Sequence, residues 1–124
     1  MTARLQTALC ILVFPVGLFA CGKDCQSTCT TLYGTAPNCG DPKGDVKGVV
    51  NNDQTRDEKM TDCMRACKDG LAKPGEVGDY DPYTKFEGEE PPTLENDRQV
   101  ALWMECIDDH SCPKIADGFC QPTW

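Results

Sequence analysis

The chain is poor in basic residues and in the side chains that most often perform catalysis. It has twelve basic residues against twenty acidic ones, a formal charge of −8, and a single histidine, His110. An acidic surface repels phosphates, so we do not expect nucleic acid as a partner. The motifs His-Glu-x-x-His, Gly-x-Ser-x-Gly and the phosphate-binding glycine loops are missing. The sequence therefore predicts a non-enzymatic protein without a cofactor or a metal site.

The length of 124 residues allows one small domain, and the first twenty residues indicate an export signal. Arg4 is the only charge in that stretch, and residues 9–19 form an apolar run. The run ends in Leu18-Phe19-Ala20-Cys21, with an aliphatic residue three positions before the cysteine and a small one directly before it. This motif resembles the lipobox of bacterial lipoproteins. A plain secretory signal and an uncleaved membrane anchor are the alternatives.

The lipobox resemblance implies that residues 1–20 are removed and that Cys21 becomes a diacylated N-terminus. Residues 21–24 then form the lipid anchor with a short linker, and residues 25–124 form the cysteine-rich helical domain. Acyl chains, at about 0.8 kcal/mol per buried methylene, hold such a protein on a membrane surface. Because Gly22 rather than an aspartate follows the cysteine, the enterobacterial sorting pattern implies the outer membrane of a bacterial envelope.

Large aliphatic side chains are scarce beyond the leader. Residues 21–124 contain thirteen Leu, Ile, Val and Phe residues, and loss of Arg4 takes the net charge from −8 to −9. Such a composition is typical of disordered chains. Eight cysteines besides Cys21 indicate instead a disulfide framework that replaces a large core. They are Cys25, Cys29, Cys39, Cys63, Cys67, Cys106, Cys112 and Cys120.

Three stretches with helical spacing predict an all-α fold: a small disulfide-stapled domain with a helical hairpin, a third helix and long loops. We expect helices over residues 23–33, 54–69 and from about 93 to 110, with a short helical turn over 113–118. Trp103 is the expected core anchor because no other side chain offers comparable area. The expected helix ends and first-turn residues are Gly34, Asn52 or Asp53, Gly70, Thr93, Glu95 and Asp97.

Two of these helices carry the same Cys-x3-Cys motif. Cysteines four apart lie on one helix face, so two such helices packed antiparallel can be closed by two bridges. That geometry resembles the twin Cys-x3-Cys hairpins of the mitochondrial intermembrane space, a compartment that the leader argues against. We expect the pairs Cys25–Cys67, Cys29–Cys63, Cys39–Cys106 and Cys112–Cys120, among 105 possible pairings of eight cysteines.

The C-terminal cysteines follow a second loose pattern, Trp103-x2-Cys106-x5-Cys112-Pro113-x6-Cys120. It resembles the ends of small cysteine-rich lipoproteins of myxobacteria and their relatives. This resemblance covers about twenty residues and implies location in the envelope, without an assigned activity.

Thiol chemistry is the competing interpretation. Cys-x3-Cys also occurs as a copper-binding spacing, and Met60 and Met64 flank one pair on the same helix face. A thioredoxin-like site needs Cys-x2-Cys at a helix start, which is missing. Because exported thiols are normally oxidised, we expect bridged cysteines with the methionines in the core. His110 follows two aspartates at a predicted helix end, where a cation is favourable on structural grounds alone.

Two connections separate the predicted helices. Residues 34–52 form a turn-rich loop pinned by Cys39, without the ligand pattern of a calcium site. Residues 72–92 are longer than connections in compact domains usually are, and they carry Tyr80, Tyr83 and Phe86 among acidic residues. These rings are the candidate contact surface, on an acidic and mobile loop; alternatively, they fold back to cover the helices.

The sequence thus predicts a lipid-anchored envelope protein with a non-enzymatic binding or structural role. Its expected partners are the membrane, through the N-terminal lipid, and an envelope protein that contacts residues 72–92 and the third helix. The alternative is a thiol redox or copper-handling protein that uses the Cys-x3-Cys pairs.

Overall fold

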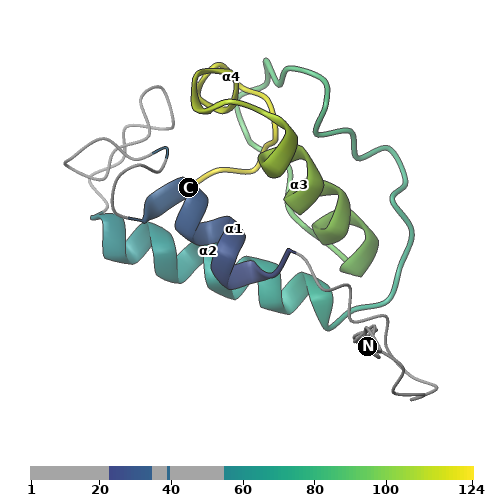
Figure 1. Cartoon of the computed structure of the whole chain (residues 1–124). Coiled ribbons are helices and arrows are strands. Elements are labelled where there is room, and N and C mark those ends of the chain that lie inside the picture. Colours follow the sequence, from purple (N-terminus) through teal and green to yellow (C-terminus); the bar gives the residue numbers. More distant parts are fainter. Residues whose placement is uncertain (1–22, 35–38, 40–54) are drawn as a thin grey trace, which may run out of the picture.

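The computed structural model describes residues 23–34, 39 and 55–124, and within them the fold is all-α, stapled by four disulfides (Figure 1). This confirms the predicted fold class, and no strand occurs in these ranges. No helix in the described ranges is long and apolar enough to cross a membrane. The predicted leader, Cys21 and most of the 34–52 loop lie outside the described residues. The helices are α1 (Cys25–Tyr33), α2 (Arg56–Leu71), α3 (Asp97–Asp109) and α4 (Cys112–Ala116).

Helix α1 begins where its capping residues can satisfy the first backbone amides. The Asp24 carboxylate accepts the backbone N–H of Ser27 at 2.7 Å, and the Ser27 hydroxyl accepts the backbone N–H of Asp24 at 3.2 Å. This reciprocal pair is a capping box. The helix ends at Gly34, as predicted, where the backbone N–H bonds the Thr30 carbonyl at 2.8 Å. Its buried face includes both cysteines, Leu32 and Tyr33.

Helix α2 starts and ends later than the sequence pattern predicted. Thr55, rather than Asn52 or Asp53, is its N-cap and forms a capping box with Glu58. Gly70 was expected just beyond the helix but lies inside it, and the helix runs to Leu71. A Cβ atom on Gly70 would stand 2.5 Å from Val100 Cγ2. The glycine therefore serves the close approach of α2 and α3, and not a helix stop.

Helix α3 begins at Asp97, so the predicted cap Thr93 and first-turn residue Glu95 precede it. The N-cap is Asn96, whose side-chain oxygen accepts the backbone N–H groups of Arg98 and Gln99 at 3.1 Å each. The Asn96 amide group also donates to the Glu76 carbonyl at 2.8 Å. The Asn96 side chain thus caps α3 and also holds the preceding loop. Its bond to Glu76 spans twenty residues, so a local sequence pattern does not reveal it.

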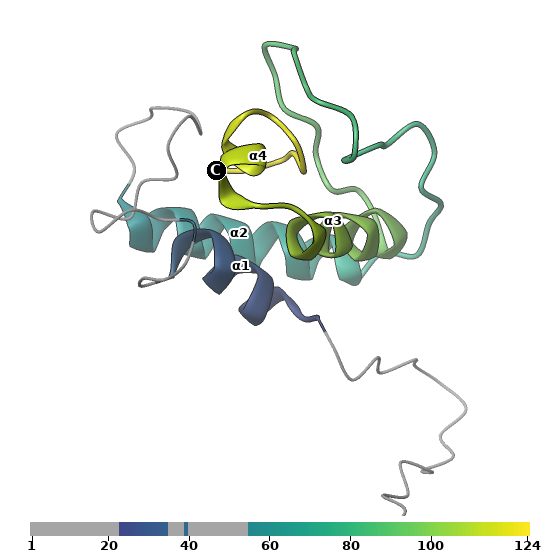
Figure 2. The same ribbon diagram turned by 45° about the horizontal axis from the view of Figure 1, so that its top comes forward.

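Helices α1 and α2 form an antiparallel pair closed by two disulfides, Cys25–Cys67 and Cys29–Cys63, as predicted. Their Cα atoms are 5.8 and 5.9 Å apart, so the bridges join two closely packed faces. Helix α3 contacts both members of the pair, and α4 follows after a sharp turn (Figures 1 and 2). The hairpin plus third helix is therefore the framework of the domain.

The other two predicted pairings are wrong: the bridges are Cys39–Cys112 and Cys106–Cys120. Cys106 lies on the buried side of α3, and the chain returns after α4 so that Cys120 meets it after 14 residues. Cys106 is thereby bonded within the C-terminal part of the chain and cannot pair with Cys39. Cys112, at the start of α4, is left for Cys39.

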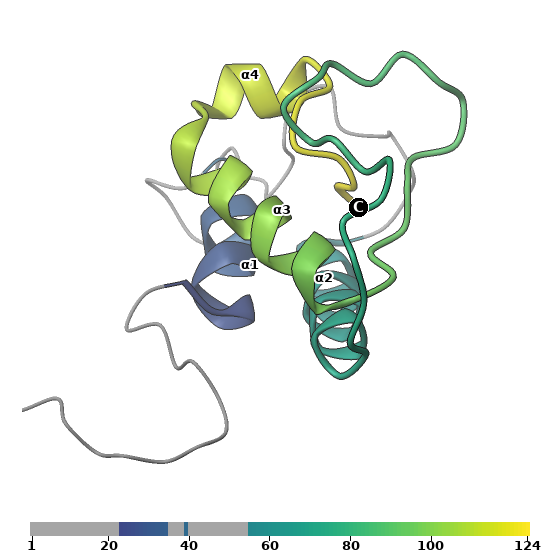
Figure 3. The same ribbon diagram turned by 90° about the vertical axis from the view of Figure 1, so that its right-hand side faces the viewer.

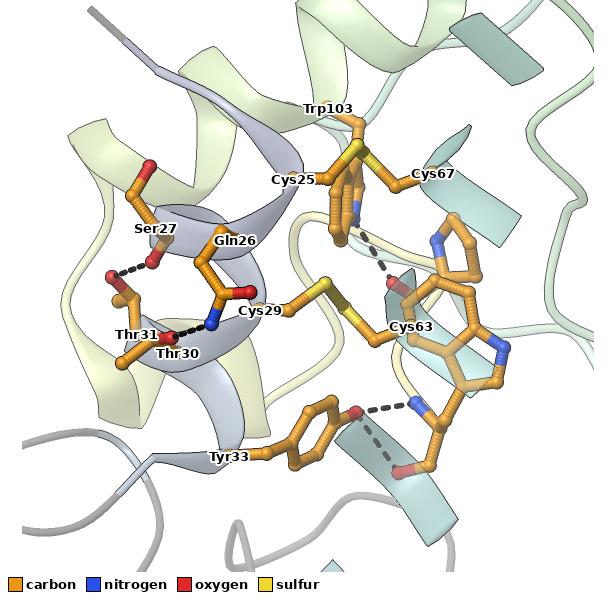
Figure 4. The surroundings of a disulfide bond; sticks show 12 residues. Cys25, Gln26, Ser27, Cys29, Thr30, Thr31, Tyr33, Cys63, Cys67 and Trp103 are labelled. Atoms are coloured by element: carbon orange, nitrogen blue, oxygen red, sulfur yellow. Dashed lines mark hydrogen bonds between the residues drawn. A yellow bond between two sulfur atoms is a disulfide. The ribbon is translucent and has the colours of Figure 1, made fainter. Parts of the chain in front are cut away.

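Trp103 is fully buried, as predicted for the core anchor. Its indole N–H donates to the Pro122 carbonyl at 3.0 Å, and its ring meets Trp124 edge-on with 5.8 Å between centroids. The Tyr33 hydroxyl donates to the Trp124 carbonyl at 2.9 Å and accepts the Trp124 backbone N–H. Figure 4 shows the Trp103 and Tyr33 rings beside the two hairpin bridges. The C-terminal segment therefore closes the core over α1 and α3.

The contact at Gly70 yields a test of helix packing. Gly70→Ala normally gains about 1 kcal/mol in a helix interior. Here we expect a net loss of about 1–3 kcal/mol of unfolding free energy from overpacking against Val100 and the Leu94 carbonyl. Urea unfolding measures it, with Gly70→Ala in a Val100→Ala background as the control. The clash should largely vanish there, whereas equal losses in both backgrounds would contradict the packing argument.

The four bridges should differ in how readily they are reduced. Cys39 and Cys112 are each partly exposed, whereas the other six half-cystines are at most 5% exposed. Because an attacking thiolate must reach a sulfur atom, limited dithiothreitol without denaturant should open Cys39–Cys112 first. Alkylation followed by peptide mass mapping identifies the opened pair, and denatured protein provides the control without a protected core. Earlier alkylation of any hairpin cysteine would contradict this order.

Candidate functional site

The 72–92 segment, the candidate contact surface, is held by hydrogen bonds at its start and in its middle. Near its start, Asp97 donates its backbone N–H to the Lys73 carbonyl at 2.8 Å, and the Gln99 side chain donates to the Val77 carbonyl at 3.1 Å. These bonds join the segment to the first turn of α3. Tertiary hydrogen bonds thus hold the start of the segment in place of secondary structure, and the mobility of the loop stays a prediction.

The middle of the segment turns at Asp81-Pro82. The Asp81 carboxylate accepts the backbone N–H of Tyr83 at 2.9 Å and the hydroxyl of Thr84 at 2.7 Å. An aspartate that bonds the backbone two residues ahead is a standard turn device, and proline next to it presets the backbone angle. The sequence Asp-Pro-Tyr-Thr thus fixes a tight reversal on its own.

The second half of the segment lies against the chain that follows α4. The Cys120 backbone N–H donates to the Pro82 carbonyl at 2.8 Å, and the Phe86 backbone N–H donates to the Gly118 carbonyl at 3.0 Å. Gly118 has φ +113°, a conformation that side chains disfavour, and a Cβ there would stand 2.9 Å from the Phe86 carbonyl oxygen. These contacts join residues more than thirty positions apart and make one rigid surface from two segments.

The three candidate rings do not form a single patch. Tyr80 is half-buried against the core, and its hydroxyl donates to the Gln121 carbonyl at 2.7 Å. Phe86 is also half-buried, whereas Tyr83 is 38% exposed. The Tyr83 hydroxyl donates to Asp109 at 2.9 Å, and its ring lies 5.3 Å from that of His110. Both expectations for these rings therefore hold in part: Tyr80 covers the core, and Tyr83 stays accessible.

Tyr80 and Phe86 line a cleft of about 330 Å³ between the 79–86 segment and the C-terminal segment. Sequence reasoning identified these two rings but missed the rest of the lining. The Asp-Pro dipeptide at Asp81-Pro82 is a turn signal that could have found part of it, whereas no local signal could bring Gln121 next to Tyr80. The remaining lining residues are Asp79, Asp81, Pro82, Thr84, Lys85, Pro92 and Gln121.

A second cluster joins Cys106, His110 and Cys120, whose possible ligand atoms lie within 4.8 Å of one another. The two sulfur atoms are bonded to each other, so neither is a thiolate that could bind a metal. The His110 Nδ1 lies 2.9 Å from the Cys106 carbonyl oxygen, which can only accept, so Nδ1 carries the hydrogen. Phe119 stacks on the His110 ring at 5.6 Å. These contacts give His110 a packing role at the end of α3.

The Cys-x3-Cys pairs are likewise fully committed to disulfides. Cys29, Cys63 and Cys67 are completely buried, and Cys25 is 5% exposed. Met60 and Met64 are partly buried and pack against the core cluster. In this oxidised state the pairs offer no soft thiolate ligands for copper.

The tyrosines provide a pH test of this arrangement. Partial burial and the Asp109 carboxylate raise the pKa of Tyr83 to about 12, and burial raises the pKa of Tyr33 and Tyr80 further above the usual value. In the unfolded chain the tyrosine hydroxyls lose their protons near pH ~10. The free energy of unfolding should therefore be unaffected by these groups below that pH and should fall as pH rises beyond it.

Phenolate absorbance of the native protein should therefore show almost no ionised tyrosine at pH ~10. Asp109→Asn removes the negative charge beside Tyr83, so this variant should ionise one tyrosine at lower pH. Tyr83→Phe in the same background is the control that assigns the transition. Normal titration of all three tyrosines in the folded wild type would refute the assignment.

A scan against protein-family models, a search of the curated proteins and a search of the solved structures each found no match to this chain. What the protein does must therefore be inferred from its own residues, of which the cleft and the disulfide framework are the most informative.

Proposed function

We propose that the protein is a lipid-anchored binding module of a bacterial cell envelope, without catalytic activity. The observation that carries the binding role is the cleft beside the 79–86 segment, whose walls are fixed by hydrogen bonds from two parts of the chain. Rigid walls reduce the ordering cost of binding a partner. The lipobox-like sequence at Leu18–Cys21 supports the anchor, and the disulfide framework suits an oxidising, exported location.

The placement of the cleft agrees with a tether at the N-terminal side. Segment 72–92 and the start of α1 lie on opposite sides of α3 (Figure 3). With Cys21 acylated, only residues 22–24 separate the lipid from α1, so α1 begins close to the membrane. Segment 72–92 then lies on the side of α3 away from the tether, where an envelope protein can reach it.

The competing role in thiol redox or copper handling has less support. It requires free thiols in the Cys-x3-Cys pairs, and all four of these cysteines are buried in bridges. Nothing in the described residues offers a replacement thiolate, because the other four framework cysteines are paired as well.

The anchor is tested by Cys21→Ala, with Cys10→Ala as a matched control, because Cys10 belongs to the predicted leader. In a bacterial host that processes lipoproteins, wild type and Cys10→Ala should incorporate labelled palmitate and sediment with membranes. Cys21→Ala should incorporate none. An intact mass measurement shows whether the leader is still attached, which separates acylation from retention by an uncleaved leader. Equal labelling of Cys21→Ala, or no labelling of wild type, would overturn the anchor.

A further inference from the structure

We propose that the cleft binds an arginine side chain presented by a partner protein. This inference rests on the proposed binding role and specifies the chemistry of its ligand. The cleft volume of about 330 Å³ is at the lower end for ligand pockets, so it suits one long side chain better than a large cofactor.

The charge around the cleft selects a cation. Segment 72–92 holds six acidic and two basic residues, a net charge of −4. The one cation in the lining, Lys85, is paired with Asp117 at 3.2 Å. The Asp79 carboxylate is exposed and has no hydrogen bond or ion pair within the described part of the chain. It is therefore available to an incoming donor, whereas an anionic ligand would be repelled.

The apolar lining selects a cation with an extended hydrocarbon stem. Tyr80 and Phe86 provide aromatic rings, and a cation over such a ring gains about 0.5–1 kcal/mol at exposed sites. Pro82 and Pro92 add apolar surface on which methylene groups can lie. A guanidinium group stacks on aromatic rings and forms paired hydrogen bonds with a carboxylate, which a lysine ammonium does not. The combination of Asp79 with these rings therefore favours arginine.

The cleft is also ready for binding without rearrangement. Tyr80 is fixed by its bond to Gln121, and Asp81 is held by its turn bonds to Tyr83 and Thr84. The backbone of Phe86 is fixed by Gly118. Because these walls are already ordered, a single side chain can bind measurably although its contact area is small.

The test uses the mature, oxidised, ¹⁵N-labelled protein in a neutral detergent, titrated with the blocked peptide Gly-Gly-Arg-Gly-Gly. We expect amide resonances of the cleft lining to shift with the arginine peptide, and no binding of its citrulline counterpart, which has the same shape without the charge. The lysine counterpart should bind several-fold more weakly. Equal binding of the lysine or citrulline peptide, or shifts confined to other surfaces, would overturn the assignment.

Variants of the cleft lining show which residues bind the arginine side chain. Asp79→Asn should raise the dissociation constant about tenfold through loss of a charge-assisted pair, and Phe86→Leu about threefold through loss of the cation–ring contact. Asp69→Asn is the matched control, since Asp69 is exposed on α2 and outside the cleft lining, and it should leave binding unchanged. Unchanged binding in Asp79→Asn would also overturn the proposal.

Failure of this proposal can be told apart from failure of the binding role. A photo-crosslinking amino acid at Thr84 in living cells, compared with one at Asp69, reports any protein at the cleft. A specific Thr84 adduct together with no arginine binding would overturn only the ligand chemistry. Absence of both would overturn the binding role as well, while the acylation test decides the anchor independently.

Discussion

The structure depends on the two parallel bridges that join α1 and α2. With so few large aliphatic side chains, burial alone leaves little to offset the conformational entropy of the chain. Each bridge stabilises the fold by about 2–4 kcal/mol, largely by restricting the unfolded chain. The bridges also supply core material, since Cys29, Cys63 and Cys67 are completely buried and sit beside Leu32 and Trp103 in one cluster. The helical hairpin therefore forms a face on which α3 can pack.

The C-terminal segment completes that core in a way that the hairpin cannot. Trp103 needs a partner for its indole N–H, because a buried donor without an acceptor is costly, and the Pro122 carbonyl provides it. Tyr33 exchanges two hydrogen bonds with Trp124 across the same region. Polar atoms of two buried rings are thus satisfied by backbone from the last residues of the chain, so the end of the sequence is part of the fold.

The sequence predicted the features that are local and periodic. Cysteines four apart on one helix face specified the hairpin bridges, and the stripe through Trp103 identified the core anchor. The predictions were wrong where segments distant in the sequence determine the structure. Gly70 is required by its contact with Val100 across the interface of α2 and α3. Asn96 caps α3 and also binds the Glu76 carbonyl. The pairing of Cys106 with Cys120 follows from the return of the chain after α4. In the cleft, Tyr80 and Phe86 were recognisable as exposed aromatic candidates, but Gln121 reaches Tyr80 only through tertiary structure.

The disulfide framework and the cleft are physically linked at Pro82. Its carbonyl accepts the Cys120 backbone N–H at 2.8 Å and lies 3.3 Å from the Cys106 sulfur, so the Cys106–Cys120 bridge stands directly behind one wall of the cleft. Cys120 adopts φ +57°, an uncommon conformation for a residue other than glycine, and the bridge together with the bond to Pro82 holds it there. The same covalent staple that replaces core burial therefore also fixes the geometry of the candidate binding surface. A long acidic connection without secondary structure can in this way present a defined cleft, because the framework behind it adds to the order that its local turn at Asp81-Pro82 provides.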